Sequence, residues 1–112
     1  MDDCLFCRIV RGEIPSEKLY EDDELLAFYD IAPQAPVHFL VIPKQHIEDC
    51  ADINESNSSV VAKAFELISK LTKEKGIESF RVVSNTGREA GQSVQHLHFH
   101  VLAGRDMTWP PG

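Results

Sequence analysis

The sequence predicts an α+β fold, a mainly antiparallel sheet of about five strands with one short N-terminal helix and one long helix. Five short segments have the apolar pattern of strands, and only one connection between strands contains a long helical repeat. The chain has 112 residues, 43% of them hydrophobic and 26% charged, which is typical of one globular domain. We therefore expect a single domain over residues 1–112, in which 104–112 form a C-terminal tail.

The first element is a short helix over residues 4–11, where apolar side chains follow helical spacing. Asp2 or Asp3 can cap its start, and a glycine at position 12 can end it. Cys4 and Cys7 are three residues apart, so we expect both thiols on one face of this helix.

Three strands are expected next, because apolar and β-branched residues gather in short runs between turn residues. The acidic residues at 21–24 indicate a hairpin turn between the first two strands, and two prolines mark a loop at 30–36. The third strand is a nearly continuous apolar run that stops at Pro43, as expected of a buried, central strand. The three strands are predicted at 18–20, 25–29 and 38–42.

The second half of the chain contains the long helix and the last two strands. Apolar residues recur at helical spacing over 58–75, and Gly76 supplies a left-handed end. Strands follow at 79–84 and 94–103, separated by a glycine-containing loop at 85–92. Neither a repeat nor a low-complexity tract interrupts this order.

The net charge of −7 argues against a groove for a long nucleic acid, which needs excess lysine and arginine, but it allows a small anionic ligand in a local pocket. No apolar run approaches the length of a membrane span, and the N-terminus lacks the features of a signal peptide. We expect a cytoplasmic or nuclear protein that contacts no membrane. Its three cysteines are then reduced thiols or metal ligands.

Three of the five histidines alternate with apolar residues near the end of the chain. On an extended strand His96, His98 and His100 point to one side, while the residues between them face the core. Imidazole can act as a nucleophile, a general acid or base, or a metal ligand, and three imidazoles on one face can bind zinc. The preceding loop, 85–93, offers two glycines and polar donors that suit a phosphate oxygen.

The run from Gly91 to Leu102 resembles the signature of the histidine triad (HIT) superfamily. Four further segments resemble its nucleoside phosphoramidase branch, the histidine triad nucleotide-binding (HINT) proteins, and the likeness covers nearly the whole chain. The resemblance implies a HIT-like fold whose sheet extends across a two-fold homodimer, with Trp109 near the interface. The four segments are Phe28–Ile31, Gln34–Pro36, His38–His46 and Trp109–Gly112.

The resemblance also implies a mechanism. His98 would attack the α-phosphorus of a purine nucleoside phosphoramidate or a related acyl nucleotide, and water would then release a nucleoside monophosphate such as AMP or GMP. Ser93, His100 and backbone amides of the loop would hold the negative charge. His38 and a backbone carbonyl are candidates for orienting His98, although His38 can equally be a structural strand histidine. The chemical step requires no cofactor.

The nucleotide-binding residues also follow from the resemblance. Asp30 would accept hydrogen bonds from the ribose hydroxyls, and a mostly apolar pocket would hold the base, which implies broad purine acceptance. Several of the apolar residues can equally be plain core. The full set is Phe6, Ile9, Ile14, Phe28, Tyr29, Asp30, Ile31, Asn85, Gly91, Gln92, Ser93, His98 and His100.

Cys4 and Cys7 form half of a common zinc pattern, and the other ligands must come from the fold. The resemblance proposes His46 and His96, which would complete a closed, structural Zn²⁺ site that ties the first helix to the histidine segment. The alternative is a pair of reduced thiols packed in a helix, because the tail that ends in Trp-Pro-Pro-Gly is typical of members without these cysteines. Cys50 has no assigned role.

Three other functions are compatible with the sequence. A sister branch with the same triad hydrolyses dinucleoside polyphosphates, and a nucleotide-binding protein can serve as a scaffold without turnover. The third alternative is a zinc hydrolase in which His96, His98 and His100 hold an ion with an activated water.

Overall fold

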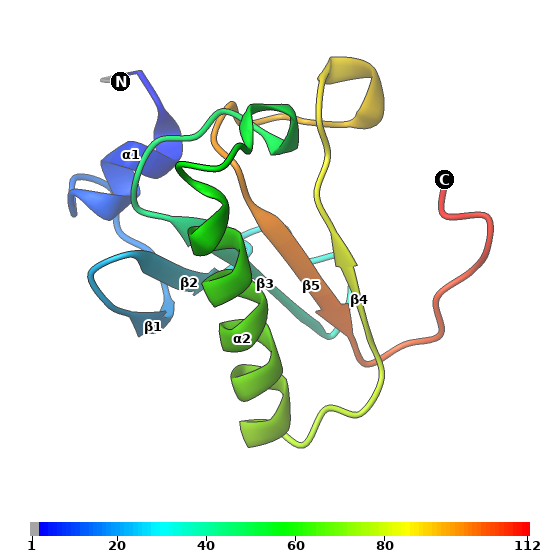
Figure 1. The fold of residues 1–112 in the computed structure, drawn as a ribbon. Coiled ribbons are helices and arrows are strands. Elements are labelled where there is room, and N and C mark those ends of the chain that lie inside the picture. Colours follow the sequence, from blue (N-terminus) through cyan, green and yellow to red (C-terminus); the bar gives the residue numbers. More distant parts are fainter. Residues whose placement is uncertain (1–2) are drawn as a thin grey trace.

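The computed structural model describes residues 3–112 and contains one five-stranded sheet with the strand order β1-β2-β3-β5-β4. Every neighbouring pair is antiparallel, which confirms the predicted α+β fold (Figure 1). The strands are β1 (Lys18–Glu21), β2 (Leu25–Tyr29), β3 (Val37–Pro43), β4 (Phe80–Val83) and β5 (Phe99–Ala103). The helices are α1 (Leu5–Val10), α2 (Ser58–Glu74) and the 3-10 turns η1 (Cys50–Asp52) and η2 (Arg88–Ala90).

The two α-helices cover opposite faces of the sheet. Helix α2 packs its apolar stripe on one face, against alternate residues of β2, β3 and β5. Helix α1 packs on the other face through Phe6 and Ile9, which contact Leu26, Phe28 and Leu40. Because strand side chains alternate between faces, the even-numbered histidines of β3 and β5 lie on the α1 side. Within the described residues, no helix combines the length and the apolar character needed to cross a membrane.

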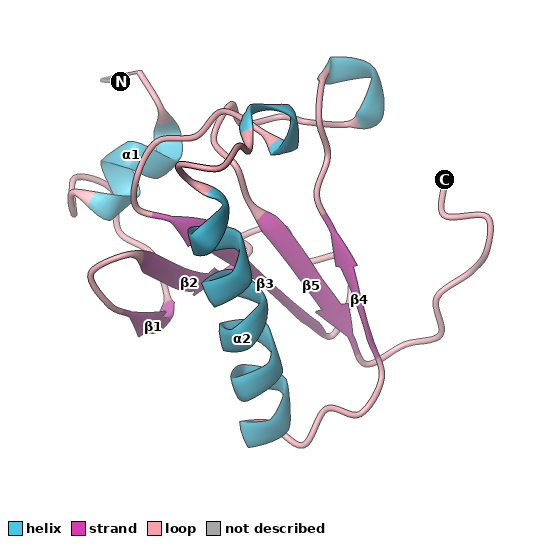
Figure 2. Cartoon of the chain, in the orientation of Figure 1, coloured by secondary structure: helices cyan, strands magenta, loops and turns pink. Residues whose placement is uncertain are grey.

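The last strand is shorter than the predicted 94–103, because β5 begins at Phe99. The preceding residues are loop in Figure 2 and are held by other bonds: the Leu97 N–H donates to the Ile47 carbonyl, and the Ser84 hydroxyl donates to the His98 carbonyl. The partner strand β3 ends at Pro43, which has no N–H to continue the ladder. The alternation of sides nevertheless continues, since Leu97 and Phe99 are both buried in the core under α2.

The start of helix α1 also differs from the expected aspartate cap. Cys4 is the N-cap, and its Sγ accepts a hydrogen bond from the Cys7 N–H at 3.3 Å. Asp3 precedes the cap, and Asp2 lies outside the described residues. The predicted ends of both helices are confirmed, since Gly12 and Gly76 have positive φ angles of 79° and 70°.

Candidate active site and metal centre

His98 and His100 lie side by side on the face of the sheet that carries α1, with ring centroids 4.9 Å apart. The Nδ1–H of His98 donates to the backbone carbonyl of His96 at 2.7 Å, because a carbonyl oxygen can only accept. The lone pair of the neutral ring is thereby placed on Nε2. The ring of Phe6 packs perpendicular to that of His98, with the centroids 5.1 Å apart. His98 therefore has the tautomer that a nitrogen nucleophile requires.

Burial keeps these imidazoles neutral. Desolvation lowers the pKa of His98, and it lowers that of His100 to about 4, with further contributions from the neighbouring His98 and His38. Desolvation also lowers the pKa of His38. All three rings are therefore uncharged near pH 7, so a lone pair on His98 is available without the prior loss of a proton.

His38 is positioned by β3 and contacts His100 rather than His98. Its Nε2 lies 2.9 Å from Nδ1 of His100, and its Nδ1 accepts a hydrogen bond from the Gln34 N–H at 3.0 Å. Of the two candidates for orienting His98, the structure supplies the backbone carbonyl. Asp30 lies beside this group, with Oδ2 3.5 Å from the His38 Nε2. We name Asp30, His38, His98 and His100 the histidine cluster.

The residues expected to hold a base divide into two groups. Phe6, Ile9 and Phe28 belong to one apolar cluster beside His98, and Ile14 packs against that cluster. Tyr29 instead packs on the face covered by α2, since it follows Phe28 along the strand and points the other way. Ile31 is fully exposed in the loop after β2. The structure thus brings together four of the six.

The glycine-containing loop lies against the segment that follows β3. The buried Gln92 side chain holds it there, because its Nε2 donates to the Glu48 and Val94 carbonyls and its Oε1 accepts from the Gly87 N–H. The Gln92 amide is thus a brace for the loop. Gly91 has a φ of 100°, and a Cβ built on it would lie 3.6 Å from the Asn85 amide. These bonds hold the loop, which Ser93 directly follows, against the segment after β3.

Sequence reasoning missed two groups that shape the site. The Ser84 hydroxyl donates to the His98 carbonyl at 2.9 Å, so it anchors the backbone of the candidate nucleophile. The Pro43 carbonyl lies 2.8 Å from Nε2 of His96. Both groups stand at strand ends, and only the pairing of distant strands places them beside the histidines.

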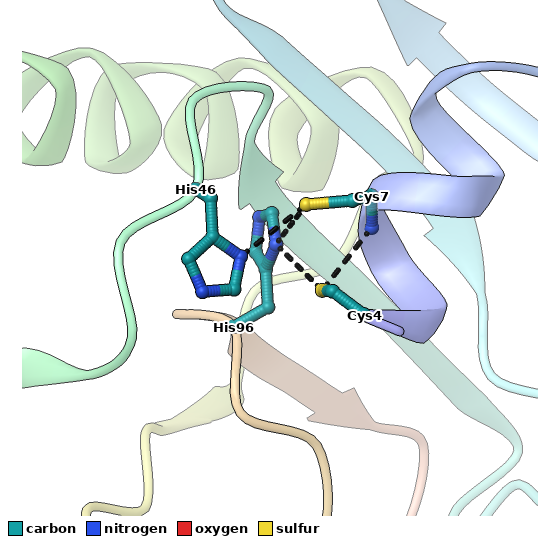
Figure 3. A group of neighbouring side chains, drawn as sticks. All are labelled: Cys4, Cys7, His46 and His96. Atoms are coloured by element: carbon teal, nitrogen blue, oxygen red, sulfur yellow. Dashed lines mark hydrogen bonds between the residues drawn. The ribbon is translucent and has the colours of Figure 1, made fainter. Parts of the chain in front are cut away.

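Cys4, Cys7, His46 and His96 converge as the resemblance proposes (Figure 3). Nδ1 of His96 lies 3.3 Å from the Cys4 Sγ and 3.5 Å from the Cys7 Sγ, and Nδ1 of His46 lies 3.3 Å from the Cys7 Sγ. We name these four residues the Cys2His2 cluster. Helix α1 supplies the thiols, and the segments after β3 and before β5 supply the imidazoles.

The geometry of the Cys2His2 cluster fits a tetrahedral ion. Zinc bonds of about 2.3 Å to sulfur and 2.0–2.1 Å to nitrogen place the two atoms roughly 3.6 Å apart, close to the observed separations. The His96 Nε2–H donates to the Pro43 carbonyl, which leaves a single Nδ1 lone pair facing two sulfurs. One cation between the four atoms would contact both sulfurs and both Nδ1 nitrogens.

The Cys7 thiol of the Cys2His2 cluster is protonated without an ion. Burial, together with the adjacent Cys4, raises the pKa of Cys7 to about 11, so a bound metal would displace its proton. Cys4, His46 and Ser93 border one surface hollow of about 470 Å³, which gives an ion a route from solvent. The described residues thus contain a Cys/His group that could bind a metal ion.

A metal centre built from His96, His98 and His100 does not fit this geometry. The His96 ring is fully buried, with Nε2 at the Pro43 carbonyl and Nδ1 at the thiols. Nδ1 of His98 is bonded to a carbonyl and Nδ1 of His100 faces His38. The three rings therefore have different partners, which disfavours the zinc hydrolase alternative.

Known proteins resemble this chain over almost its full length. Residues 3–109 match the family described as the C-terminal binding domain of scavenger mRNA decapping enzyme. An uncharacterized HIT-like protein of Synechococcus elongatus is 45% identical over 112 residues, covering 99% of this chain and 98% of the relative. The similarity thus covers nearly the whole length of both chains.

Two solved structures have nearly the same fold. A HIT family hydrolase from Legionella pneumophila Philadelphia 1 has a TM-score of 0.95 and 46% identity, and the match covers 98% of this chain and 100% of that one. A histidine triad protein from Clostridium difficile has a TM-score of 0.92 and 47% identity, with 96% of each chain covered. The alternating histidines, the five-stranded sheet and these relatives together show that the chain belongs to the histidine triad (HIT) family.

Proposed function

We propose that this protein hydrolyses purine nucleoside phosphoramidates, and related acyl nucleotides, to nucleoside monophosphates through a covalent nucleotidyl-His98 intermediate. The observation that carries the proposal is the state of the His98 ring, which is neutral, braced by Phe6 and bonded through Nδ1 to the His96 carbonyl. The similarity to a HIT family hydrolase supports the reaction class.

The first step forms a bond from His98 Nε2 to the α-phosphorus and breaks the phosphorus–nitrogen bond, and the leaving amine takes a proton from solvent water, to which the attacking water of the second step returns one. In the second step water attacks phosphorus and the bond to His98 breaks, which frees the monophosphate and restores the imidazole. Negative charge gathers on the phosphoryl oxygens in both steps. His100, Ser93 and the backbone amides of the braced loop are the donors that stabilise it.

The nucleoside would bind over the apolar cluster next to His98. Phe6, Ile9, Ile14 and Phe28 offer the base an apolar wall, and Asp30 offers carboxylate oxygens to the ribose hydroxyls. Such a wall distinguishes poorly between adenine and guanine, because it provides few polar contacts to the base edge. We therefore expect both purines to be accepted.

The decisive experiment compares the wild type with His98→Ala on an adenosine phosphoramidate, with AMP release measured by chromatography. We expect the variant to lose at least 10³-fold in kcat, on the order of 4 kcal/mol of barrier. Quenching of the wild type in denaturant at alkaline pH, where a phosphorus–nitrogen bond to histidine survives, should trap a protein adduct with the mass of one nucleotidyl group. A smaller loss, or an unmodified protein during turnover, would refute His98 as the nucleophile.

Two control substrates separate the competing functions. A dinucleoside polyphosphate cleaved faster than the phosphoramidate would favour the sister activity. Wild-type protein that binds AMP but turns over neither compound would indicate a scaffolding role. Retention of activity in a chelator is expected, since the proposed step uses no metal.

Zinc is the ion we propose for the Cys2His2 cluster, where it would join α1 to the segment that carries His98. Two thiolates and two imidazoles in a tetrahedral arrangement are ligands that Zn²⁺ prefers. The ion would supply structural cross-linking. His98 itself would be positioned by its bond to the carbonyl of His96.

We also propose that the protein is a homodimer whose interface includes β4. This strand stands at the edge of the sheet, and its first residue, Phe80, is 42% exposed, while Phe65 of α2 is 46% exposed. Arg81 donates to the Thr108 carbonyl and so holds the exposed Trp109 near the same edge. Light scattering should give twice the 12.6 kDa chain mass, and a Phe80→Glu variant should shift it to the monomer. A wild-type mass of one chain would contradict the proposal.

A further inference from the structure

His38 and His100 come from neighbouring antiparallel strands and are joined ring to ring. The two nitrogens, Nε2 of His38 and Nδ1 of His100, are 2.9 Å apart, and His38 is buried while His100 is partly open to solvent. A hydrogen bond at this distance needs one donor and one acceptor, so only one of the two nitrogens carries the proton. The direction of the bond decides which nitrogen of His100 faces the substrate as N–H.

The loop before β3 fixes that direction. The Gln34 N–H points at Nδ1 of His38 from 3.0 Å, and a backbone N–H can only donate. Nδ1 of His38 must therefore keep its lone pair, and the proton of the neutral ring must be on Nε2. The Nε2–H then donates to His100, whose Nδ1 is the acceptor and whose own proton is on Nε2.

Other partners of the His38 ring are consistent with this assignment. Oδ2 of Asp30 lies 3.5 Å from Nε2 of His38, so it is a second, longer acceptor for the same proton. Asp30, His38 and His100 also lie close enough to be ligands of a metal ion. A metal on Nε2 of His38 would force the proton to Nδ1, against the Gln34 N–H, so this geometry disfavours an ion there.

We infer that His38 is a positioning residue. It accepts a hydrogen bond from the backbone N–H of Gln34 and thereby holds His100 as the Nε2–H tautomer. The inference rests on the proposed function for its consequence: beside the lone pair of His98, the site then presents a proton on His100 to a phosphoryl oxygen. The opposite tautomer of His100 would place a second lone pair against that oxygen, which would repel it.

The Gln34 peptide is itself fixed from both sides. Its carbonyl accepts a hydrogen bond from Arg105 Nε at 2.9 Å, and its side-chain amide donates to the Ala32 carbonyl. The Ala32 N–H in turn donates to Asp30 Oδ1. The donor that sets the His38 tautomer is therefore part of a loop braced by bonds to three other residues.

Nitrogen-15 NMR of wild-type protein labelled at histidine tests the tautomers directly and requires no substrate. We expect protonated Nε2 and unprotonated Nδ1 for both His38 and His100 near pH 7. For His98 the carbonyl contact predicts the opposite pattern, which provides an internal reference. Protonated Nδ1 on His100, or on His38, would overturn the inference whatever the protein hydrolyses.

Two substitutions separate the donor of His38 from its acceptor. In His38→Gln the amide nitrogen reaches the place of Nε2 and keeps the donor toward His100. In His38→Asn the amide oxygen takes the place of Nδ1 and keeps the acceptor for Gln34, but the donor is lost. We expect kcat for the phosphoramidate to fall about 10- to 100-fold in His38→Asn with a nearly unchanged KM. The kcat of His38→Gln should be at least ten times that of His38→Asn.

The labelled variants give a second readout, since His38→Gln should keep His100 as the Nε2–H tautomer and His38→Asn should show a mixture. Equal losses of kcat in the two variants, or a larger loss in His38→Gln, would overturn the inference and assign His38 a structural role. A wild type with the expected tautomers but without phosphoramidase turnover would refute the proposed function and leave the tautomer assignment standing.

Discussion

The Cys2His2 cluster and the histidine cluster use the same side chain for different chemistry, although His96 and His98 are only two residues apart. His96 gives its Nε2–H to the Pro43 carbonyl and turns Nδ1 toward two sulfurs. His98 gives its Nδ1–H to the His96 carbonyl and keeps the lone pair on Nε2. The ring nitrogen held by a backbone carbonyl thus decides which nitrogen keeps its lone pair, and this difference underlies the separate roles that we propose for the two histidines.

The largest effect we expect on stability comes from removing the thiols of the Cys2His2 cluster. Cys4→Ser combined with Cys7→Ser should abolish zinc binding and lower the free energy of unfolding by about 4 kcal/mol or more, because loss of a bound metal is among the changes with the largest effects on stability. Urea melts and metal analysis of purified protein check this. Cys50→Ser is the matched control, because that thiol is exposed and lies outside the cluster.

The two clusters should be separable by mutation. The Cys double variant should therefore melt at a lower temperature, while the protein that stays folded keeps measurable phosphoramidase turnover. Wild-type protein with less than a tenth of an equivalent of zinc, and with the same melt as the double variant, would show that the thiols are merely packed.

A smaller loss of stability is expected when the Gln92 side chain can no longer hold the glycine-containing loop against the segment after β3. Gln92→Glu replaces a donor with an acceptor opposite the Glu48 and Val94 carbonyls in a buried position. We expect a cost of about 3 kcal/mol, because two carbonyls lose their donor and a carboxylate oxygen would be buried against them. The same change at the exposed Gln45 should cost almost nothing. Equal urea midpoints for the two variants would contradict the bracing role.

The histidine cluster should make the stability of the protein depend on pH. The pKa of His100 is about 4 in the folded protein and 6.5 in the unfolded chain, so between these values the unfolded chain binds the extra proton. The free energy of unfolding is therefore unaffected by this group above pH 6.5 and decreases as the pH falls toward 4. By pH 5 about 2 kcal/mol is lost. Urea melts at pH 7.5 and 5 should show a smaller difference for His100→Phe than for wild type.

An equal pH dependence in the His100→Phe variant would assign the acid lability to other groups. His98 and His38 have the same direction of shift, so the variant should reduce the slope without removing it.

The sequence predicts those features that depend on local pattern. The apolar run at 38–42 specified the central strand, and the spacing over 58–75 specified the helix almost to the residue. The two cysteines share one helix face, as i and i+3 require. Such features need only the periodicity of helices and strands and the turn chemistry of glycine.

The features that could not be predicted depend on contacts between distant segments. The start of β5 at Phe99 follows from the end of β3 at Pro43, and the partner of His38 follows from how β3 and β5 align. The Cys4 cap arises because the thiol can accept from Cys7, a choice that the usual cap preferences do not include. Tertiary alignment therefore decided which nitrogen of each histidine is used.

The smallest effects we expect separate Phe28 from Tyr29, which are adjacent in β2 but face opposite sides of the sheet. The Tyr29 hydroxyl accepts a hydrogen bond from Lys75 on the α2 side, in an exposed pair. Tyr29→Phe should therefore cost under about 0.5 kcal/mol and leave the KM for the phosphoramidate unchanged. Phe28→Leu should raise the KM a few fold, because Phe28 packs edge to face on Phe6 beside His98. A raised KM in Tyr29→Phe would show that the nucleotide also reaches the face covered by α2. The proposal that the nucleotide binds only on the face that carries α1 would then be wrong.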